Sequence, residues 1–191
     1  VQNTNRSINL EYLVTKLAVL GQPHPLNIAH SYETAGPTYP YGCHIAEVEI
    51  DPATCAVALV RFTVVDDFGL VINPQMLSGQ IHGGIAQGVG QALYEHVVYD
   101  DDGQILSGSF LDYAMPRADH FPPLDIHMHN TPCKNNILGI KGSGEAGAIG
   151  APQAVIGAVC DALGIQHVDM PVTPKKIFHI LYNEQIDRKA G

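Results

Sequence analysis

The chain has 191 residues, of which 46% are hydrophobic and 15% are charged, so it is long and apolar enough to fold around a core as one domain or a large piece of one. Its 10 Lys and Arg against 19 Asp and Glu give a formal net charge of −9. Nucleic acids and anionic membranes reward basic residues in their partners, so this composition argues against both kinds of binding.

The four cysteines, at positions 43, 55, 133 and 160, are far apart in the sequence and form no CxxC spacing. A zinc or iron–sulfur site made by this chain alone is therefore not expected, and we expect reduced thiols in a cytoplasmic protein. We expect no membrane span and no signal sequence, since residues 1–9 are polar. Because residue 1 is Val, we expect a processed chain or a piece of a longer protein.

Residues 1–69 predict one helix and one hairpin. Apolar residues recur at helical spacing between positions 8 and 20, where Gly21 and Pro23 end the pattern. The Pro-, Gly- and Tyr-rich stretch 23–42 predicts an irregular connection. Apolar residues then follow strand-like patterns over 45–50 and 57–65, and the short link between them predicts an antiparallel hairpin, with a turn at 66–69.

The second part of the chain mixes helices and strands. Residues 79–96 predict a helix, although four glycines lie inside it and each costs about 1 kcal/mol relative to Ala. We further expect a hairpin over 97–106, a strand with one exposed face over 124–128, and helices over 151–163 and after Thr173-Pro174. Strict βαβ alternation is missing, so the predicted class is α+β, with a mixed, mainly antiparallel sheet and packed helices.

The most informative segment is KGSGEAG at residues 141–147, which places one carboxylate, Glu145, among glycines. Glycine lets a backbone approach a ligand closely, so Glu145 is either a surface turn residue or a base held against a group that it deprotonates. The rest of the chain favours the base.

Residues 142–147 also match the GxGxxG pattern of dinucleotide-binding domains, with 137–140 as a possible preceding strand. Glu145 would put a negative charge where a pyrophosphate normally meets the start of a helix, which argues against this interpretation. A dinucleotide-binding oxidoreductase domain is accordingly the less favoured, alternative function.

Residues 79–88, GQIHGGIAQG, are the second unusual segment. Bare amides at a glycine-rich helix start could bind a phosphate, with Gln80 and Gln87 as further donors and acceptors. Close packing of two helices through glycine explains the same pattern equally well. The histidines are dispersed, including His127 and His129 on one probable strand face, so no metal-ligating residue is assigned.

Six short motifs follow one another along the chain: GCHIAEVEID (42–51), VDDFG (65–69) with INP (72–74), GQIHGGIAQG (79–88), GSFLDY (108–113), KGSGEAG (141–147) and MPVTP (170–174). In this fixed order they resemble the molybdenum-binding large subunit of the xanthine dehydrogenase / aerobic carbon monoxide dehydrogenase family, the molybdenum hydroxylases. The resemblance covers nearly the whole chain and is closest to the bacterial three-subunit branch.

The resemblance implies an enzyme that oxidises a substrate carbon with oxygen derived from water. It implies molybdenum on molybdopterin, in the cytosine dinucleotide form common in this branch, with [2Fe–2S] clusters and FAD on partner subunits. Glu145 matches the family's catalytic base, and Gln80 matches a glutamine close to the molybdenum. The remaining implied cofactor-binding residues lie in the glycine-rich segments: Gly83, Gly84, Gly142, Ser143 and Gly144.

The family's large subunit is much longer than this chain, whose sequence lacks the upstream GGFGG-like cofactor motif and the upstream active-site loop. In carbon monoxide dehydrogenases that loop carries a copper-binding cysteine. We therefore expect residues 1–191 to be the C-terminal portion of a molybdenum cofactor-binding domain, with a helix and an irregular connection over 1–42 and the main cofactor-binding part over 43–187.

Such a portion is expected to be inactive alone. Its expected partners are the remainder of the large subunit, an iron–sulfur small subunit, an FAD medium subunit and a small-molecule substrate. The alternative is a non-catalytic fragment or truncated paralogue that keeps the fold without holding the metal.

Overall fold

The computed structural model describes residues 3–21 and 28–183, and the chain divides into two compact units, 1–35 and 36–191. In the first unit, helix α1 (Leu10–Val19) begins where the Asn9 side chain accepts a hydrogen bond of 2.7 Å from the Tyr12 amide. This confirms the helix predicted between residues 8 and 20. Residues 28–40 contain no helix or strand, as expected for an irregular connection, whereas positions 22–27 of that connection lie outside the described residues.

The second unit is built on a three-stranded sheet with the order β1-β2-β3. Strands β1 (Tyr41–Ile50) and β2 (Val57–Asp67) form the predicted antiparallel hairpin, and β3 (Leu124–Met128) pairs with β2 in parallel. The sheet is therefore mixed, as the α+β class predicts. The turn predicted over 66–69 starts too early, because Asp66 still pairs with Gly42 on one side and Met128 on the other.

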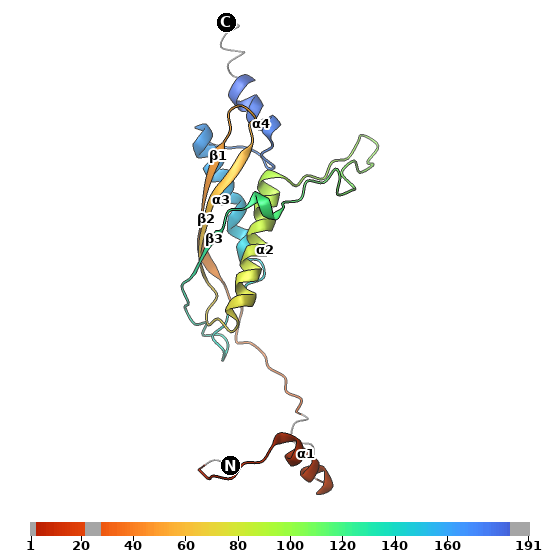
Figure 1. The fold of residues 1–191 in the computed structure, drawn as a ribbon, viewed down its shortest axis with the longest axis vertical. Coiled ribbons are helices and arrows are strands. Elements are labelled where there is room, and N and C mark those ends of the chain that lie inside the picture. The colour runs from red at the N-terminus through yellow and green to blue at the C-terminus, as the bar shows by residue number, and fades with distance from the viewer. Residues whose placement is uncertain (1–2, 22–27, 184–191) are drawn as a thin grey trace. The chain divides into compact units, whose positions relative to one another are not determined.

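Helices α2 (Pro74–Leu93) and α3 (Ala146–Leu163) run along one side of the sheet (Figure 1). Helix α3 packs against β1 and β2, and α2 packs against α3. Their buried apolar side chains form a single core with the inner face of the sheet. Among its fully buried members are Phe62, Val64, Ile81, Ile85, Val89, Val155 and Val159.

Both helices begin five residues before their predicted starts. At α2, the Asn73 side chain accepts a 3.0 Å hydrogen bond from the Met76 amide, and Pro74 occupies the first turn. Glycines 79, 83 and 84 therefore lie inside the helix, where amides bond to carbonyls four residues back. The expectation of bare amides at a helix start is wrong for this segment.

Glycine instead lets α2 and α3 approach each other closely. A Cβ atom on Gly84 would lie 2.8 Å from the Gly147 Cα, and one on Gly147 would lie 2.5 Å from the Ile81 carbonyl oxygen. A Cβ on Gly88 would lie 2.8 Å from the Ala151 Cβ. Real Cβ contacts do not come this close, so the helix-packing interpretation of residues 79–88 is confirmed for Gly84 and Gly88.

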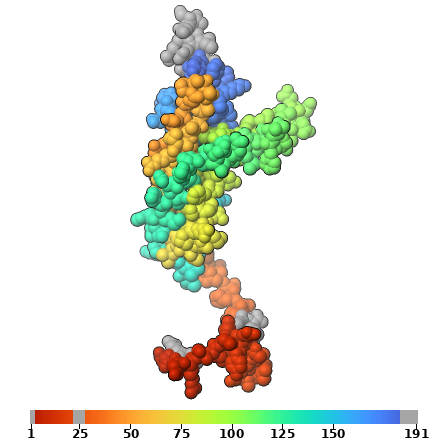
Figure 2. Space-filling view, in the orientation of Figure 1, coloured from red at the N-terminus to blue at the C-terminus, as the bar shows by residue number. Residues whose placement is uncertain are grey.

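The segment that follows α2 projects away from the rest of the second unit (Figures 1 and 2). The hairpin predicted over 97–106 is reduced to one bridge between Tyr99 and Ile105, next to a 2.8 Å hydrogen bond from the Leu106 amide to the Val98 carbonyl. The other short elements are a 3₁₀ turn (Ala118–His120), helix α4 (Pro174–Phe178) and a π-helical turn (His179–Asn183). Helix α4 starts after Thr173, as predicted, with the Thr173 hydroxyl accepting from the Lys176 amide.

Among the described residues, α3 is the one helix that is long and apolar enough to span a membrane. Its residues Ala151, Val155 and Val159 are nevertheless fully buried in the protein core. A helix of this length and composition is also typical of a protein core, and α3 contributes these side chains to the core.

Candidate functional site

A buried ion pair fixes the start of the segment 141–147. The Lys141 Nζ lies 2.8 Å from the Asp67 Oδ2, and the two side chains are 9% and 2% exposed. The Lys141 Nζ also lies 4.5 Å from the centre of the Tyr41 ring. The pair therefore joins the end of β2 to the first residue of the glycine-rich segment.

The Asp67 carboxylate is held in its ionised form. It accepts hydrogen bonds from the Gly69 amide at 2.7 Å and the Thr131 amide at 3.0 Å, in addition to Lys141. Burial raises the pKa of this carboxyl, but the hydrogen bonds from Lys141, Gly69 and Thr131 outweigh burial and hold its pKa well below the ordinary range.

The backbone before Lys141 is tied to the turn after β2. The Lys141 amide donates to the Phe68 carbonyl at 2.9 Å, and the Leu70 amide donates to the Gly139 carbonyl at 2.9 Å. Gly69 has a φ of +68° and would clash with the Gly139 carbonyl if it carried a Cβ. The strand considered for 137–140 is absent apart from one bridge between Gly69 and Ile140, so the dinucleotide fingerprint lacks the strand that should precede it.

Beyond Lys141 the backbone is open. Gly142 and Gly144 are exposed, and a Cβ built on either would meet no atom within 4 Å. Glu145 stands at the N-cap of α3, where its carbonyl accepts from the Ala148 amide at 2.9 Å and its side chain caps no amide. The Glu145 carboxylate is thus exposed at a helix N-terminus, an end of the helix that favours a nearby negative charge.

A hollow of about 340 Å³ lies between the start of α2 and this segment. Gln80 of α2 and Ser143 of the glycine-rich segment both line it, together with Lys141. The rest of its wall is largely apolar and comprises Phe68, Leu70, Val71, Ile72, Asn73, Met76, Leu77 and Ile140. Two segments more than 60 positions apart in the chain therefore contribute polar groups to one cavity.

The other predicted site residues fall into two groups. Gly83 is exposed on α2 with no atom near its missing Cβ, as are Gly142 and Gly144. Gly84 is buried against α3, so its contribution is the close approach of the two helices. That approach places Gly147, two residues after Glu145, beside the turn of α2 that follows Gln80.

A second buried polar pair was not predicted as part of a site. The His44 Nε2 lies 3.5 Å from the Asp66 Oδ1, with side chains 6% and 4% exposed, and the His44 ring meets Phe62 edge to face. A Cβ on Gly150 of α3 would lie 2.7 Å from the His44 Cγ. The His44 Nδ1 and the Asp66 Oδ2 are buried without a hydrogen-bond partner among the described residues. The only signal in the sequence was their presence in two of the six motifs.

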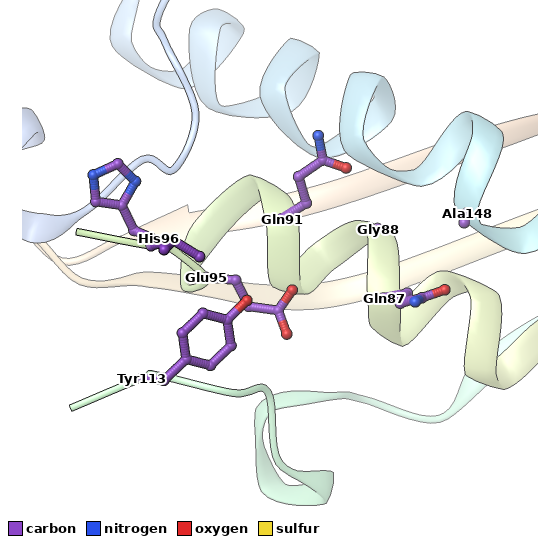
Figure 3. A pocket seen from close by; sticks show the side chains of 8 residues that line it. Gln87, Gly88, Gln91, Glu95, His96, Tyr113 and Ala148 are labelled. Atoms are coloured by element: carbon purple, nitrogen blue, oxygen red, sulfur yellow. The ribbon is translucent and has the colours of Figure 1, made fainter. Parts of the chain in front are cut away.

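A further hollow of about 460 Å³ lies at the C-terminal half of α2 (Figure 3). Gln87, Gln91, Glu95, His96 and Tyr113 line it, and the Glu95 carboxylate and Tyr113 ring point toward one another in the figure. The sequence indicated Gln87 as a candidate donor and acceptor, and it included Tyr113 only as the last residue of the motif 108–113. The spacing of four between Gln87 and Gln91, which places both on one face of α2, could have indicated Gln91.

No group of three or more His, Cys, Asp or Glu side chains among the described residues could hold a metal ion. All four cysteines fall within the described residues and are free thiols there. A metal at this site would therefore need ligands from a cofactor or from other polypeptide.

Comparison with known proteins gives consistent matches. A family model described as a molybdopterin cofactor-binding domain matches residues 1–122. The chain is 41% identical over 155 residues to the nicotine 6-hydroxylase large subunit of Paenarthrobacter nicotinovorans, covering 80% of this chain and 19% of that subunit.

Solved structures agree. Quinoline 2-oxidoreductase from Pseudomonas putida 86 is 42% identical with a TM-score of 0.70, over 73% of this chain and 18% of its own. The Cu,Mo-CO dehydrogenase in its carbon monoxide reduced state is 30% identical with a TM-score of 0.76, over 85% of this chain and 21% of its own. The chain therefore spans about a fifth of the length of the proteins that it matches.

Proposed function

We propose that this chain, which belongs to the molybdenum hydroxylase large-subunit family, is the part of such a subunit that presents the base Glu145 at a molybdenum cofactor. The observation that carries the proposal is the geometry of Glu145. Its carboxylate is exposed and makes no capping hydrogen bond to α3. The glycine-rich backbone that carries it is fixed on both sides, by Lys141 and by Gly147. A base needs such a position, within hydrogen-bond reach of the proton that it removes and not already committed to a partner.

The hollow beside the glycine-rich segment and the exposed glycines of residues 79–88 and 141–147 have the chemistry to contact a molybdopterin cofactor. Gln80 and Ser143 offer amide and hydroxyl groups that can donate and accept hydrogen bonds. Gly83, Gly142 and Gly144 offer bare backbone surface that a side chain would otherwise cover. We assign these residues to cofactor contact, with Gly84 contributing through the packing of α2 on α3. When bound, the cofactor would supply the two-electron redox chemistry and the site of oxygen transfer.

Within this proposal each residue has a defined task. Glu145 accepts a proton in the oxidation of a substrate carbon with oxygen derived from water. Gln80 and Ser143 orient the cofactor. The exposure of Glu145 and of the hollow in this chain requires other polypeptide to exclude water, which fits a chain that spans a fifth of its relatives.

We assign that covering role to the remainder of the large subunit, with residues 1–191 as the C-terminal portion of the cofactor-binding domain. The proposal includes the cytosine dinucleotide form of the cofactor, [2Fe–2S] and FAD on separate small and medium subunits, and a cytoplasmic location.

The test is Glu145→Gln in the intact enzyme, because glutamine keeps the size of the side chain and removes the base. We expect unchanged molybdenum and pterin content and a loss of turnover of at least 10²-fold, the lower range for a general base. Near-normal turnover would exclude the assigned role.

The alternative is a fragment that keeps the fold without holding the cofactor. Purified together with its partner chains, such a fragment would contain neither molybdenum nor pterin, whereas the proposal expects both. A dinucleotide-binding domain would bind NAD saturably, and the proposal expects no saturable binding.

A further inference from the structure

Strand β2 ends in two adjacent buried carboxylates that hold basic partners from different elements. Asp67 holds Lys141, which opens the glycine-rich segment, at 2.8 Å. Asp66 holds His44 of β1 at 3.5 Å, on the side of the sheet that α3 covers. Both pairs are almost fully removed from solvent, whereas the other pairs between oppositely charged side chains found among the described residues are largely exposed.

The two basic partners hold the chain on either side of Glu145. Lys141 precedes Glu145 by four residues, and the His44 ring lies against Gly150, five residues after it. Gly150 must lack a side chain for this contact, since its Cβ would lie 2.7 Å from the His44 Cγ. Between these two points, a Cβ built on Gly142 or Gly144 would meet no atom within 4 Å, and the Gly142 amide makes one long hydrogen bond, of 3.4 Å, to the Thr38 hydroxyl. The position of Glu145 is therefore set by Lys141 on one side and by the start of α3 on the other, where Gly147 packs on α2 and Gly150 packs on His44.

Stability alone does not explain this arrangement. Burying two charged or polar pairs costs desolvation energy that an apolar pair of similar size avoids. The cost is larger here because the His44 Nδ1 and the Asp66 Oδ2 have no hydrogen-bond partner among the described residues. Directional pairs of this kind specify position, and they are placed where a base must be held.

We propose that Asp66 and Asp67 are positioning residues for Glu145: Asp67 fixes the segment before it through Lys141, and Asp66 fixes the first turns of α3 through His44 and Gly150. We name these four side chains, His44, Asp66, Asp67 and Lys141, the aspartate brace. The inference rests on the proposed function, since it concerns the base named there. None of the four is required to touch substrate or cofactor.

The first experiment is Lys141→Met in the intact enzyme, which keeps the side chain's length and removes its charge. We expect unchanged molybdenum content, a kcat lower by on the order of 10²-fold, as for a reacting group misplaced by about 1 Å, and a smaller change in KM. Lys141→Arg, which restores the charge, should recover most of the kcat. The matched control is Arg61→Met, which breaks the exposed Arg61–Asp125 pair at 3.0 Å between β2 and β3 and should leave kcat unchanged.

Two measurements separate positioning from a merely structural role. In a Glu145→Gln background, Lys141→Met should lower kcat no further, because residues that act through one group are not additive. Amide hydrogen exchange over residues 142–146 should become about tenfold faster in Lys141→Met and stay unchanged in Arg61→Met. An additive loss in kcat, or unchanged exchange in that segment, would overturn the inference.

The Glu145→Gln variant tests the proposed function separately from the positioning role. If Glu145→Gln keeps normal turnover, the proposed function fails, whatever the Lys141 variants show. If Glu145→Gln is inactive and the Lys141 effect is additive, only the positioning role fails. Should Lys141→Met not fold, Asp66→Asn, which keeps the shape of its side chain, tests the other flank by the same exchange and kcat measurements.

Discussion

The contact between α2 and α3 predicts opposite effects for two neighbouring glycines. Gly83 and Gly84 have the same helical backbone, but only Gly84 faces α3. A Cβ on Gly84 would lie 2.8 Å from the Gly147 Cα and 2.9 Å from the Ala148 nitrogen, where carbon contacts normally lie at about 3.5–4.0 Å. The helices would have to move apart by roughly 1 Å, and such overpacking typically costs about 1–3 kcal/mol.

Gly84→Ala also gains about 1 kcal/mol of helix propensity, so it should lower the free energy of unfolding by up to about 2 kcal/mol. Gly83→Ala is the matched control, because it gains the same propensity with no atom within 4 Å of the new methyl group. In thermal unfolding, the Tm of Gly84→Ala should therefore lie below that of the parent chain and the Tm of Gly83→Ala above it, with a shift of about 2–4 °C for each kcal/mol. A Gly84→Ala variant as stable as Gly83→Ala would refute the close helix contact.

Two further predictions concern stability. Asn73→Ala removes the cap of α2 and should cost about 0.5–2 kcal/mol in the free energy of unfolding, whereas Asn73→Asp should keep most of it; equal losses in the two variants would show that the Asn73–Met76 hydrogen bond does not matter. The pKa of folded Asp67 lies below its ordinary value of 3.8, so the Asp67 interactions add stability above about pH 4 and lose it as the pH falls toward and below 2. The difference in Tm between the parent chain and Asp67→Asn should therefore shrink on acidification from about pH 5, and a constant difference would contradict the ionised, hydrogen-bonded Asp67.

The local elements of the fold could be predicted because their signals are local. The helical period of α1, the alternation in β3 and the Thr173 cap of α4 each depend on residues a few positions apart. The start of α2 was also readable, from the Asn73-Pro74 cap, but its apolar period becomes clear only later in the helix.

What the sequence could not predict depends on contacts between distant segments. Asp66 and Asp67 were expected in a turn, yet pairing with β1 extends β2 to Asp67. The sequence does not decide between an anion site and helix packing at residues 79–88, because the answer depends on the contact of Gly84 with the distant Gly147. The glycine-rich segment around Glu145 was located from the sequence, whereas its two anchors, Lys141 with Asp67 and Gly147 with α2, were not.

The role of Glu145 is tested most directly by mixing the oxidised, fully assembled enzyme with substrate under anaerobic conditions and following a single turnover by absorbance. The account predicts that Glu145→Gln, with its full molybdenum content, is reduced by substrate at least 10²-fold more slowly than the parent enzyme. Reduction of both enzymes at the same rate would contradict it.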